Sequence, residues 1–427
     1  MARVVVIGAG AMGLAAGYHA LKRGHQVAVL EAAPEPGGMA AHFDLGGLSI
    51  ERYYHFICRA DRPTFELLGE LGLGDRMRWV PTSMGYYFDG RLEPWGDPVS
   101  LLRFPGLSLV AKLRYGAMMF FAVRRPNANE LEHVSAKEWI TRWCGADVYE
   151  RLWAPLFKLK FYEYADNISA AWIWARIKRL GTSRRSMFQE ELGYIDCGSE
   201  TLIHALVAAI RKRGGEVRLS IPVSRIAAQA GRVAGVVAGA ETFPADAVIC
   251  TVPTPLVPRL APDLPAADLA RYQAIVNIGV VCVVLRLKRS VSPHFWINIS
   301  DPRFEIPGIV EFSNLRPTGD AVVYIPYYMP VAHPKFARSD DVFRAEGFGY
   351  LKLINSALRE DDVIACHVGR LRHAQPVCPP GFAAMLPPVQ TAIAGLQIAD
   401  TSFYYPEDRG IAESVRLGKA MAERVAA

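Results

Sequence analysis

Three glycines and one glutamate near the start of the chain have the spacing of a nucleotide site. Gly8, Gly10 and Gly13 form the pattern G-x-G-x-x-G, and Glu31 follows the last of them by eighteen residues. In such a pattern the first glycine allows a tight turn, the second lets a pyrophosphate approach the backbone, and the third lets a helix pack closely. The helix that begins there offers free N–H groups to phosphates, and the acid can accept hydrogen bonds from a ribose. This stretch predicts a dinucleotide-binding site.

Two strands and a helix must hold these residues in place. Val4–Ile7 is a β-branched run of the kind buried in a parallel sheet, and residues 26–31 form a second apolar run. Between the two runs, small residues recur at helical spacing from Gly13 to Ala20, as close packing of a helix on a sheet requires. Strand, helix and strand in this order predict a Rossmann-like unit of the α/β class. Because no basic residue follows Glu31, the phosphate of NADP is not expected here.

A glycine pair extends the motif. Gly37 and Gly38 lie six and seven residues after Glu31. This extension resembles the dinucleotide-binding motif of the superfamily of FAD-dependent amine oxidases, phytoene desaturases and protoporphyrinogen oxidases. The resemblance implies that the cofactor is FAD and that the glycine pair lies along its pyrophosphate and ribityl chain. Met39 stands where the family usually has an arginine that contacts the cofactor.

The end of the chain resembles the last motif of the same superfamily. The stretch Leu396–Gly418 reads as a strand, a tyrosine-rich loop and a helix, and Asp400 matches an acid near the ribityl chain and pyrophosphate. The resemblance implies that the first N–H groups of this helix face the N1–C2=O edge of the flavin, where the helix dipole stabilises negative charge. Val223 matches a backbone contact of relatives to the adenine. The implied cofactor-binding residues are Gly8, Gly10, Ala11, Met12, Gly13, Glu31, Ala32, Gly37, Gly38, Met39, Val223, Asp400, Gly410, Ile411 and Ala412.

The stretch Gly46–Ile57 carries candidates for catalysis. Glu51 and His55 match an acid and a histidine that relatives have beside the flavin ring. Two interpretations are open. The stretch is a strand whose alternating aromatic side chains face a core, or Tyr54 or His55 faces the flavin or the substrate. In the second case the histidine could exchange a proton near neutral pH.

The tyrosines of the last loop pose a similar choice. Tyr404 and Tyr405 line the substrate cavity in one interpretation, and Glu407 pairs with Arg409 on the surface in the other. In amine oxidases a lysine often holds a water against flavin N5, and no residue of this chain clearly matches it.

The middle of the chain resembles the substrate-binding part of the superfamily. Within residues 76–187, the stretch 138–179 reads as packed helices with aromatic residues at helical intervals, and Lys158, Lys160 and Arg176 are its polar residues of interest. Residues 261–389 alternate strand-like runs and turns, which predicts a mostly antiparallel sheet. The expected organisation is an FAD-binding domain of residues 1–75, 188–260 and 390–427, interleaved with an α+β substrate-binding domain of residues 76–187 and 261–389.

Composition limits the choice of partners. The 427 residues carry a net charge of +6 that is spread along the chain, which argues against nucleic acid. Seven cysteines without a C-x-x-C pair predict reduced thiols in a cytoplasmic protein and no metal site. No signal peptide or membrane-spanning run is expected. The apolar segment 99–125 is dotted with arginines. It is helical core, the wall of an apolar substrate tunnel, or a peripheral contact with the inner face of a membrane. The oligomeric state is left open.

These features predict an FAD-dependent oxidoreductase of the desaturase or oxidase type. It would move a hydride to flavin N5 from a small-molecule substrate that is bulky and apolar, or linked to a lipid or sugar. One alternative is a non-redox flavin enzyme of the nucleotide-sugar mutase type, with Arg370, Arg372 and Tyr324 as candidates to grip a diphosphate. The other is a flavin-free, prenyl-binding escort-like protein, which the intact glycine motif, Glu31 and Asp400 disfavour.

Overall fold

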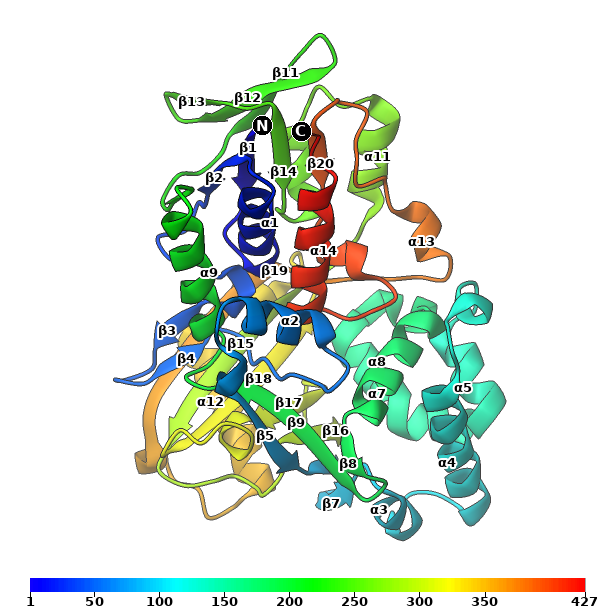
Figure 1. The fold of residues 1–427 in the computed structure, drawn as a ribbon. Helices are drawn as coiled ribbons and strands as arrows, with labels where there is room; N and C mark the ends of the chain where they lie inside the picture. Colours follow the sequence, from blue (N-terminus) through cyan, green and yellow to red (C-terminus); the bar gives the residue numbers. More distant parts are fainter. Residues whose placement is uncertain (427) are drawn as a thin grey trace.

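A five-stranded parallel sheet forms the upper part of the molecule in Figure 1. Its strands, in spatial order, are β10 (Glu216–Arg218), β2 (Gln26–Leu30), β1 (Arg3–Ile7), β14 (Ala247–Cys250) and β20 (Leu396–Ile398). Every neighbouring pair is parallel. The computed structural model describes residues 1–426. The first strand of the chain, β1, and the last, β20, both lie in this sheet. The predicted Rossmann-like unit is confirmed.

Both faces of this sheet are covered, which explains why β1 is apolar throughout. Val4 and Val6 pack with helices α1 (Ala11–Lys22), α9 (Glu200–Lys212) and α14 (Ile411–Glu423). Val5 and Ile7 point to the opposite face. They pack with the small antiparallel sheet β11 (Arg225–Gln229), β12 (Arg232–Ala238), β13 (Glu241–Pro244) and with helices α10 (Val257–Leu260) and α11 (Ala266–Ala274). Successive side chains of a strand alternate between faces, and burial on both faces is typical of parallel sheets.

Helices α1 and α14 lie side by side on the sheet, although they come from opposite ends of the chain (Figure 1). Gly418 makes this close approach possible. A Cβ atom at Gly418 would lie 2.3 Å from the carbonyl oxygen of Met12, so only glycine fits. The last helix is therefore part of the half of the molecule that contains the parallel sheet.

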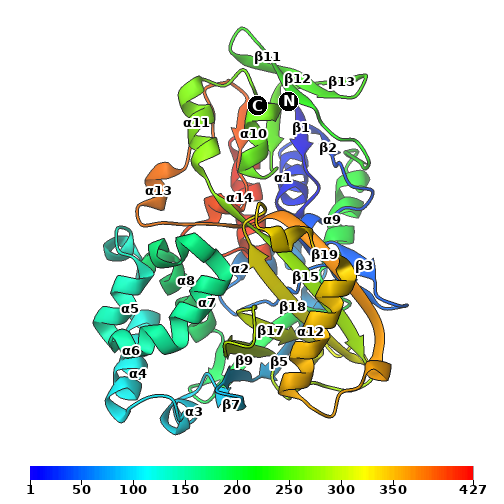
Figure 2. The same cartoon turned by 180° about the vertical axis from the view of Figure 1, so that it is seen from behind.

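A second, seven-stranded sheet forms the lower part, seen from behind in Figure 2. Its order is β19 (Val363–Pro376), β15 (Asn277–Leu287), β18 (Ala321–Met329), β17 (Gly308–Glu311), β16 (Trp296–Ser300), β6 (Met84–Phe88) and β7 (Arg91–Trp95). All pairs are antiparallel except β16 with β6, which is parallel. Helix α12 (Asp340–Ile354) packs on one side of it. The predicted mostly antiparallel sheet is confirmed.

A group of helices lies beside this sheet, at the lower right of Figure 1. It consists of α3 (Pro98–Arg103), α4 (Leu109–Arg124), α5 (Ala136–Cys144), α6 (Ala146–Val148), α7 (Ala154–Phe161) and α8 (Ala170–Thr182). The helical prediction for residues 138–179 is confirmed, since α5, α7 and α8 lie there. The wider segment 76–187 also contains strands. Residues 77–95 form β5 (Met77–Thr82), β6 and β7, and β5 pairs with β9 (Gln189–Ile195), which also pairs with β8 (Arg184–Ser186).

The remaining described elements are short. They include the hairpin β3 (His42–Asp44) with β4 (Ser49–Glu51), and helices α2 (Arg62–Glu70) and α13 (Phe382–Met385). Within residues 1–426, no helix combines the length and the apolar character needed to cross a bilayer.

Candidate active site

A cavity of about 1490 Å³ lies between the two sheets. The carboxyl ends of the parallel strands form one wall, through Ile7, Leu30 and Thr251. Strands β15, β16 and β18 form the opposite wall, for instance through Cys282 and Tyr328. Sites for one small molecule measure roughly 300–1,000 Å³, so this cavity has room for a large cofactor together with a substrate.

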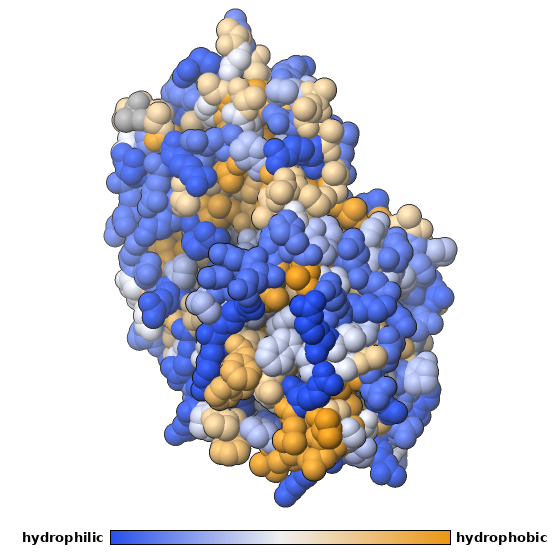
Figure 3. All heavy atoms as spheres, turned by 90° about the vertical axis from the view of Figure 1, so that its right-hand side faces the viewer, coloured by the Kyte–Doolittle hydropathy of each residue, from blue (hydrophilic) through white to orange (hydrophobic). Residues whose placement is uncertain are grey.

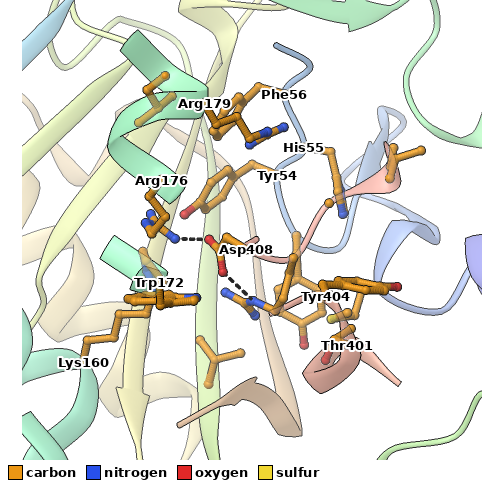
Figure 4. Close-up of a pocket in the computed structure, with 18 of the residues that line it drawn as sticks. Tyr54, His55, Phe56, Lys160, Trp172, Arg176, Arg179, Thr401, Tyr404 and Asp408 are labelled. Atoms are coloured by element: carbon orange, nitrogen blue, oxygen red, sulfur yellow. Dashed lines mark hydrogen bonds and ion pairs between the residues drawn. The ribbon is translucent and has the colours of Figure 1, made fainter. Parts of the chain in front are cut away.

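Most of the predicted site residues lie in the wall of this cavity. Those that line it are Gly8, Gly10, Ala11, Met12, Glu31, Ala32, Gly37, Gly38, Met39, Tyr54, His55, Val223, Asp400, Tyr404, Gly410 and Ile411. Gly13, Ala412 and Tyr405 do not line it. Figure 4 shows the part of the cavity where Tyr54, His55 and Tyr404 lie.

The glycine turn between β1 and α1 adopts a form that larger residues would block. Gly8 has a φ of +103°, and a Cβ atom there would lie 2.6 Å from Oγ1 of Thr251. A Cβ atom at Gly13 would lie 1.9 Å from the carbonyl oxygen of Gly8, so Gly13 serves packing rather than the cavity. Gly10 caps α1 without any side-chain hydrogen bond, which leaves the first N–H groups of the helix free to bind an anion.

Glu31 is held at the carboxyl end of β2 by its own backbone surroundings. Its Oε2 accepts a hydrogen bond from the N–H of Ala9 at 2.7 Å, and its Oε1 accepts one from the N–H of Ala33 at 2.9 Å. Each carboxylate oxygen has a further lone pair, so the group can still accept from the hydroxyls of a ribose. The fixed orientation is what a ribose-binding acid needs.

The second glycine pair packs directly on the first glycine turn. The N–H of Gly37 donates to the carbonyl oxygen of Ala9 at 2.8 Å. Gly37 has a φ of +117°, and a Cβ atom at Gly38 would lie 3.3 Å from the Cα atom of Gly10. Both glycine segments therefore present bare backbone to the same end of the cavity.

Val223 reaches the cavity from a loop and not from a strand. Strand β10 ends at Arg218, and β11 begins only at Arg225. The N–H groups of Ser220 and Ile221 donate to the carbonyl oxygens of Ala33 and Glu31 at 3.0 and 2.8 Å. These bonds carry the chain across the end of β2, and this crossing brings Val223 beside Glu31.

The C-terminal motif lines the same cavity as the glycine turns. Asp400 is buried, and its carboxylate accepts hydrogen bonds from the N–H groups of Thr254 (2.6 Å) and Ser402 (2.9 Å). Burial raises the pKa of Asp400. Gly410 precedes α14 without a side-chain cap, and Ile411 begins the helix as predicted. The N-termini of α1 and α14 thus border one cavity.

Tyr54 and His55 lie in an irregular segment, because β4 ends at Glu51. Tyr54 contacts Trp296 and Tyr324 edge-on, with ring centroids 5.5 and 5.7 Å apart. The Nδ1 atom of His55 is buried without a hydrogen-bond partner among the described residues. Burial lowers the pKa of His55 to about 4, so the imidazole is neutral at pH 7. Both side chains line the cavity, and Tyr54 also packs against a buried cluster of the antiparallel sheet.

Tyr405 is the exception among the candidate catalytic tyrosines. Its hydroxyl lies 2.7 Å from Oγ of Ser169 and donates to a carboxylate oxygen of Glu132 at 2.8 Å, and its ring packs on Phe382. Tyr405 therefore joins the last loop to the helical group. Tyr404 borders the cavity but is buried in the core around α1 and α14, with its hydroxyl 2.8 Å from Oγ of Ser414.

Glu51 does not lie beside the cavity, contrary to what the resemblance implied. Its buried carboxylate forms an ion pair with Arg316 at 2.8 Å and accepts a hydrogen bond from the N–H of Ser199 at 3.1 Å. His42 lies 3.6 Å from the same carboxylate. These contacts lower the pKa of Glu51 against the opposing effect of burial. The acid joins β4 to the start of α9 and has a structural role.

A group of charged side chains lines the cavity, and the sequence indicated only some of its members. Arg176 forms an ion pair with Asp408, and Arg409 lies beside the same carboxylate. Lys160 borders the cavity nearby, whereas Lys158 is exposed. The expected surface pair of Glu407 with Arg409 is not found, because the loop turns Arg409 inward. The sequence had indicated Lys160 and Arg176 as polar residues of interest, but it did not indicate that Arg409 and Asp408 join them.

Comparison with known proteins identifies the family. The sequence pattern of flavin-containing amine oxidoreductases matches residues 13–352, which is most of the chain. The chain belongs to the family of flavin-containing amine oxidoreductases. No curated protein sequence matches it.

Solved structures of flavin-containing amine oxidoreductases and related folds superpose over almost the whole chain. A protein from Exiguobacterium sp. 255-15, assigned as a protoporphyrinogen oxidase, is 20% identical over 99% of this chain and 98% of its own, with a TM-score of 0.75. Cyclohexylamine oxidase from Brevibacterium oxydans IH-35A is 18% identical over 99% and 98%, with a TM-score of 0.72. A reduced UDP-galactopyranose mutase is 16% identical over 99% and 95%, with a TM-score of 0.76. At these identities the likeness concerns the fold.

As a flavin-containing amine oxidoreductase, this protein is an FAD-dependent oxidoreductase. The residues present fit that cofactor. The turns at Gly8 and Gly37 would be filled by any Cβ atom, and two uncapped helix N-termini border the cavity. This assignment disfavours the flavin-free escort-like protein as an interpretation of the fold.

Proposed function

We propose that this enzyme oxidises a bulky, largely apolar small molecule at a carbon or nitrogen atom. The single observation that carries the proposal is the course of the cavity. It continues from the glycine turns at Gly8 and Gly37 into a chamber walled by Tyr54, Trp172 and Tyr328. Aromatic walls exclude water and bind apolar groups, and bound FAD supplies the acceptor for a hydride.

The expected cofactor contacts follow from the same geometry. The N–H groups at the start of α1 and the backbone of Gly37 and Gly38 bind the pyrophosphate, and Glu31 accepts from the ribose of the adenosine. Val223 borders the adenine, and Asp400 lies by the ribityl chain. The residues at the start of α14, Gly410 to Ala412, contribute N–H groups rather than side chains.

His55 is the candidate proton acceptor of the reaction. A neutral imidazole can take a proton from a substrate, and His55 is neutral at physiological pH; burial, which lowers its pKa to about 4, also makes it a weaker base. Its Nδ1 atom has no partner among residues 1–426, so it is available to a bound molecule. Tyr54 would contact the substrate through its ring, and Tyr404 borders the same cavity. Burial raises the pKa of both phenols, so neither acts as a proton acceptor.

We further propose that one part of the chain binds FAD and the other binds the substrate. Residues 1–75, 188–260 and 390–427 would bind FAD, and residues 76–187 and 261–389 would bind the substrate. The support is that the glycine turns and the acid Glu31 adjoin the parallel sheet, while Tyr328 and Trp172 come from β18 and α8.

A membrane is the expected source of such a substrate. The exposed apolar side chains of α3, α4 and the β8–β9 turn include Leu102, Leu109, Val110, Leu113, Phe120, Phe121, Met187 and Phe188. Apolar atoms gather at the lower end of the face in Figure 3, at the height of these elements in Figure 1. Phe120 and Met187 also line the cavity, so its mouth opens at this patch. Arg103, Lys112 and Arg124 accompany it, as anionic lipid would require.

A mutase-like, non-redox flavin reaction is the second candidate function. Arg176, Arg409 and Tyr54 line the same cavity, which favours it, since a diphosphate needs such groups. The earlier candidates Arg370 and Tyr324 are engaged elsewhere, with Asp340 and with the carbonyl oxygen of Glu51.

Anaerobic mixing of FAD-loaded protein with candidate substrates tests the main proposal. An apolar substrate of the expected class should bleach the flavin absorbance once per bound molecule and yield an oxidised product. A substrate that is converted without net oxidation, and only when the flavin is reduced beforehand, would establish the mutase-like reaction instead.

A further inference from the structure

The substrate end of the cavity contains more positive than negative charge. Three cationic side chains enter it, from Lys160 on α7, Arg176 on α8 and Arg409 in the loop before α14. One carboxylate, Asp408, pairs with Arg176 and lies 4.0 Å from Nε of Arg409. The exposed fractions of the Arg176, Asp408 and Arg409 side chains are 27%, 15% and 21%, so water screens them little.

Lys160 has no carboxylate partner among the ion pairs of the described residues. Its Nζ atom instead lies 5.0 Å from the ring centroid of Trp172 and 5.1 Å from that of Tyr328. Figure 4 shows Lys160 and Arg176 on either side of Trp172, with Asp408 opposite. Burial and the nearby charges of Arg176 and Arg409 lower the pKa of Lys160.

Polar atoms of this group are also left without hydrogen bonds. The Nε atom of Arg409 and the Oδ1 atom of Asp408 are buried without a partner in the part of the chain that the structure describes. An unpaired charge in an apolar cavity is costly, and a bound group of opposite charge offsets that cost. Arg179, the next arginine along the wall, is different because Asp61 pairs with it at 2.6 Å.

We propose that Lys160, Arg176 and Arg409 form a subsite that binds an anionic group of the substrate, a carboxylate or a phosphate. This inference rests on the proposed function and narrows its substrate to an apolar molecule with an anionic head. Arginine suits either group because its planar fork donates two parallel hydrogen bonds. The subsite lies between the apolar chamber and the loop that begins α14, so the head would fix the position of the apolar part beside His55. A protonated amine meets repulsion at the same place.

Four ten-carbon probes test the subsite in FAD-loaded protein: decanoate, decyl phosphate, decanol and decylamine. Binding is followed both by perturbation of the flavin spectrum and by the fluorescence of tryptophan, since Trp172 lies at the subsite. We expect the anions to bind at least tenfold more tightly than decanol, and decylamine to bind most weakly. The comparison of decanoate with decyl phosphate shows which anion the subsite prefers. Equal binding of anions and decanol would overturn the proposal without any mutation.

Variants refine the assignment. Lys160→Met and Arg176→Met should each lower the preference for anions over decanol about five- to tenfold, while Arg176→Lys should keep part of it. Arg370→Met is the matched control, because Arg370 pairs with Asp340 and does not line the cavity. A preference that survives in both Met variants would contradict the subsite. Protein that binds anions but never retains FAD would contradict the proposed function alone, and FAD-loaded protein with no preference would contradict the subsite alone.

Discussion

Arg176 of α8 and Asp408 of the last loop form an ion pair inside the cavity, 232 positions apart in the sequence. The pair connects the helical group beside the antiparallel sheet with the segment that begins α14 beside the parallel sheet. It therefore couples the position of Arg176 to the position of this loop.

Replacing Asp408 should alter ligand binding and stability in opposite directions. Asp408→Asn removes the one negative charge beside Arg176 and Arg409, so decanoate should bind several-fold more tightly. The same change should lower the free energy of unfolding by about 1–3 kcal/mol, because two arginines lose their partner. Probe titration and chemical denaturation measure the two effects. Asp340→Asn, at the exposed pair with Arg370, is the control and should change neither.

Glu31 should determine retention of FAD. Glu31→Ala removes the acceptor for the N–H groups of Ala9 and Ala33 as well as the ribose contact, so the affinity for FAD should fall at least tenfold. The amount of flavin that the purified protein releases on denaturation measures how much FAD it retains. Glu35→Ala, at an exposed position of the same loop, should retain FAD as the parent does. Equal flavin content in the two variants would remove Glu31 from the cofactor site.

Gly418 should be essential for the packing of the last helix. Gly418→Ala places a Cβ atom 2.3 Å from the carbonyl oxygen of Met12 and should lower the free energy of unfolding by about 1–3 kcal/mol. The helical control is Gly69→Ala in α2, where a Cβ atom meets nothing within 4 Å. That change should leave stability the same or raise it by up to about 1 kcal/mol. Urea denaturation distinguishes the two, and similar results would contradict the close approach of α1 and α14.

The pH dependence of stability should carry the signature of His55. Its pKa falls from 6.5 to about 4 on folding, so the unfolded chain binds the additional proton between these values. The free energy of unfolding should therefore decrease as the pH falls from 6.5 to 4. The free energy of unfolding is measured against pH for the parent and for His55→Gln. The difference between the two curves gives the contribution of His55, because glutamine does not titrate. The same variant should slow turnover more than it lowers flavin content, and an unchanged rate would exclude a role in proton transfer.

The apolar patch at the cavity mouth should bind anionic vesicles. Leu113→Ser with Phe121→Ser should reduce co-sedimentation with vesicles that contain phosphatidylserine, and added salt should reduce it further. Val342→Ser, at an exposed apolar position of α12 on another part of the molecule, is the control. Parent protein that does not sediment with such vesicles at low salt would contradict the proposed membrane contact.

The segment that contains Tyr54 and His55 shows which features the sequence pattern could predict and which it could not. Tyr54 and His55 were one of two interpretations, since alternating aromatics also suit a strand in a core. The chain leaves β4 after Glu51, and this early end turns both side chains to the cavity. Glu51 matched a family acid by its place in the motif, yet Arg316 holds it elsewhere. A partner 265 positions away is not visible in local spacing.

The sequence by itself determined the cofactor half of this protein. The spacing of Gly8, Gly13 and Glu31 depends on a turn, a helix and a strand that are contiguous, so short-range geometry dictates their arrangement. Only the tertiary structure decided the substrate half. Lys160, Arg176 and Arg409 come from three separate elements, and their convergence depends on how α7, α8 and the last loop pack around one cavity. Long-range packing of this kind depends on the whole core, and no single stretch of sequence encodes it.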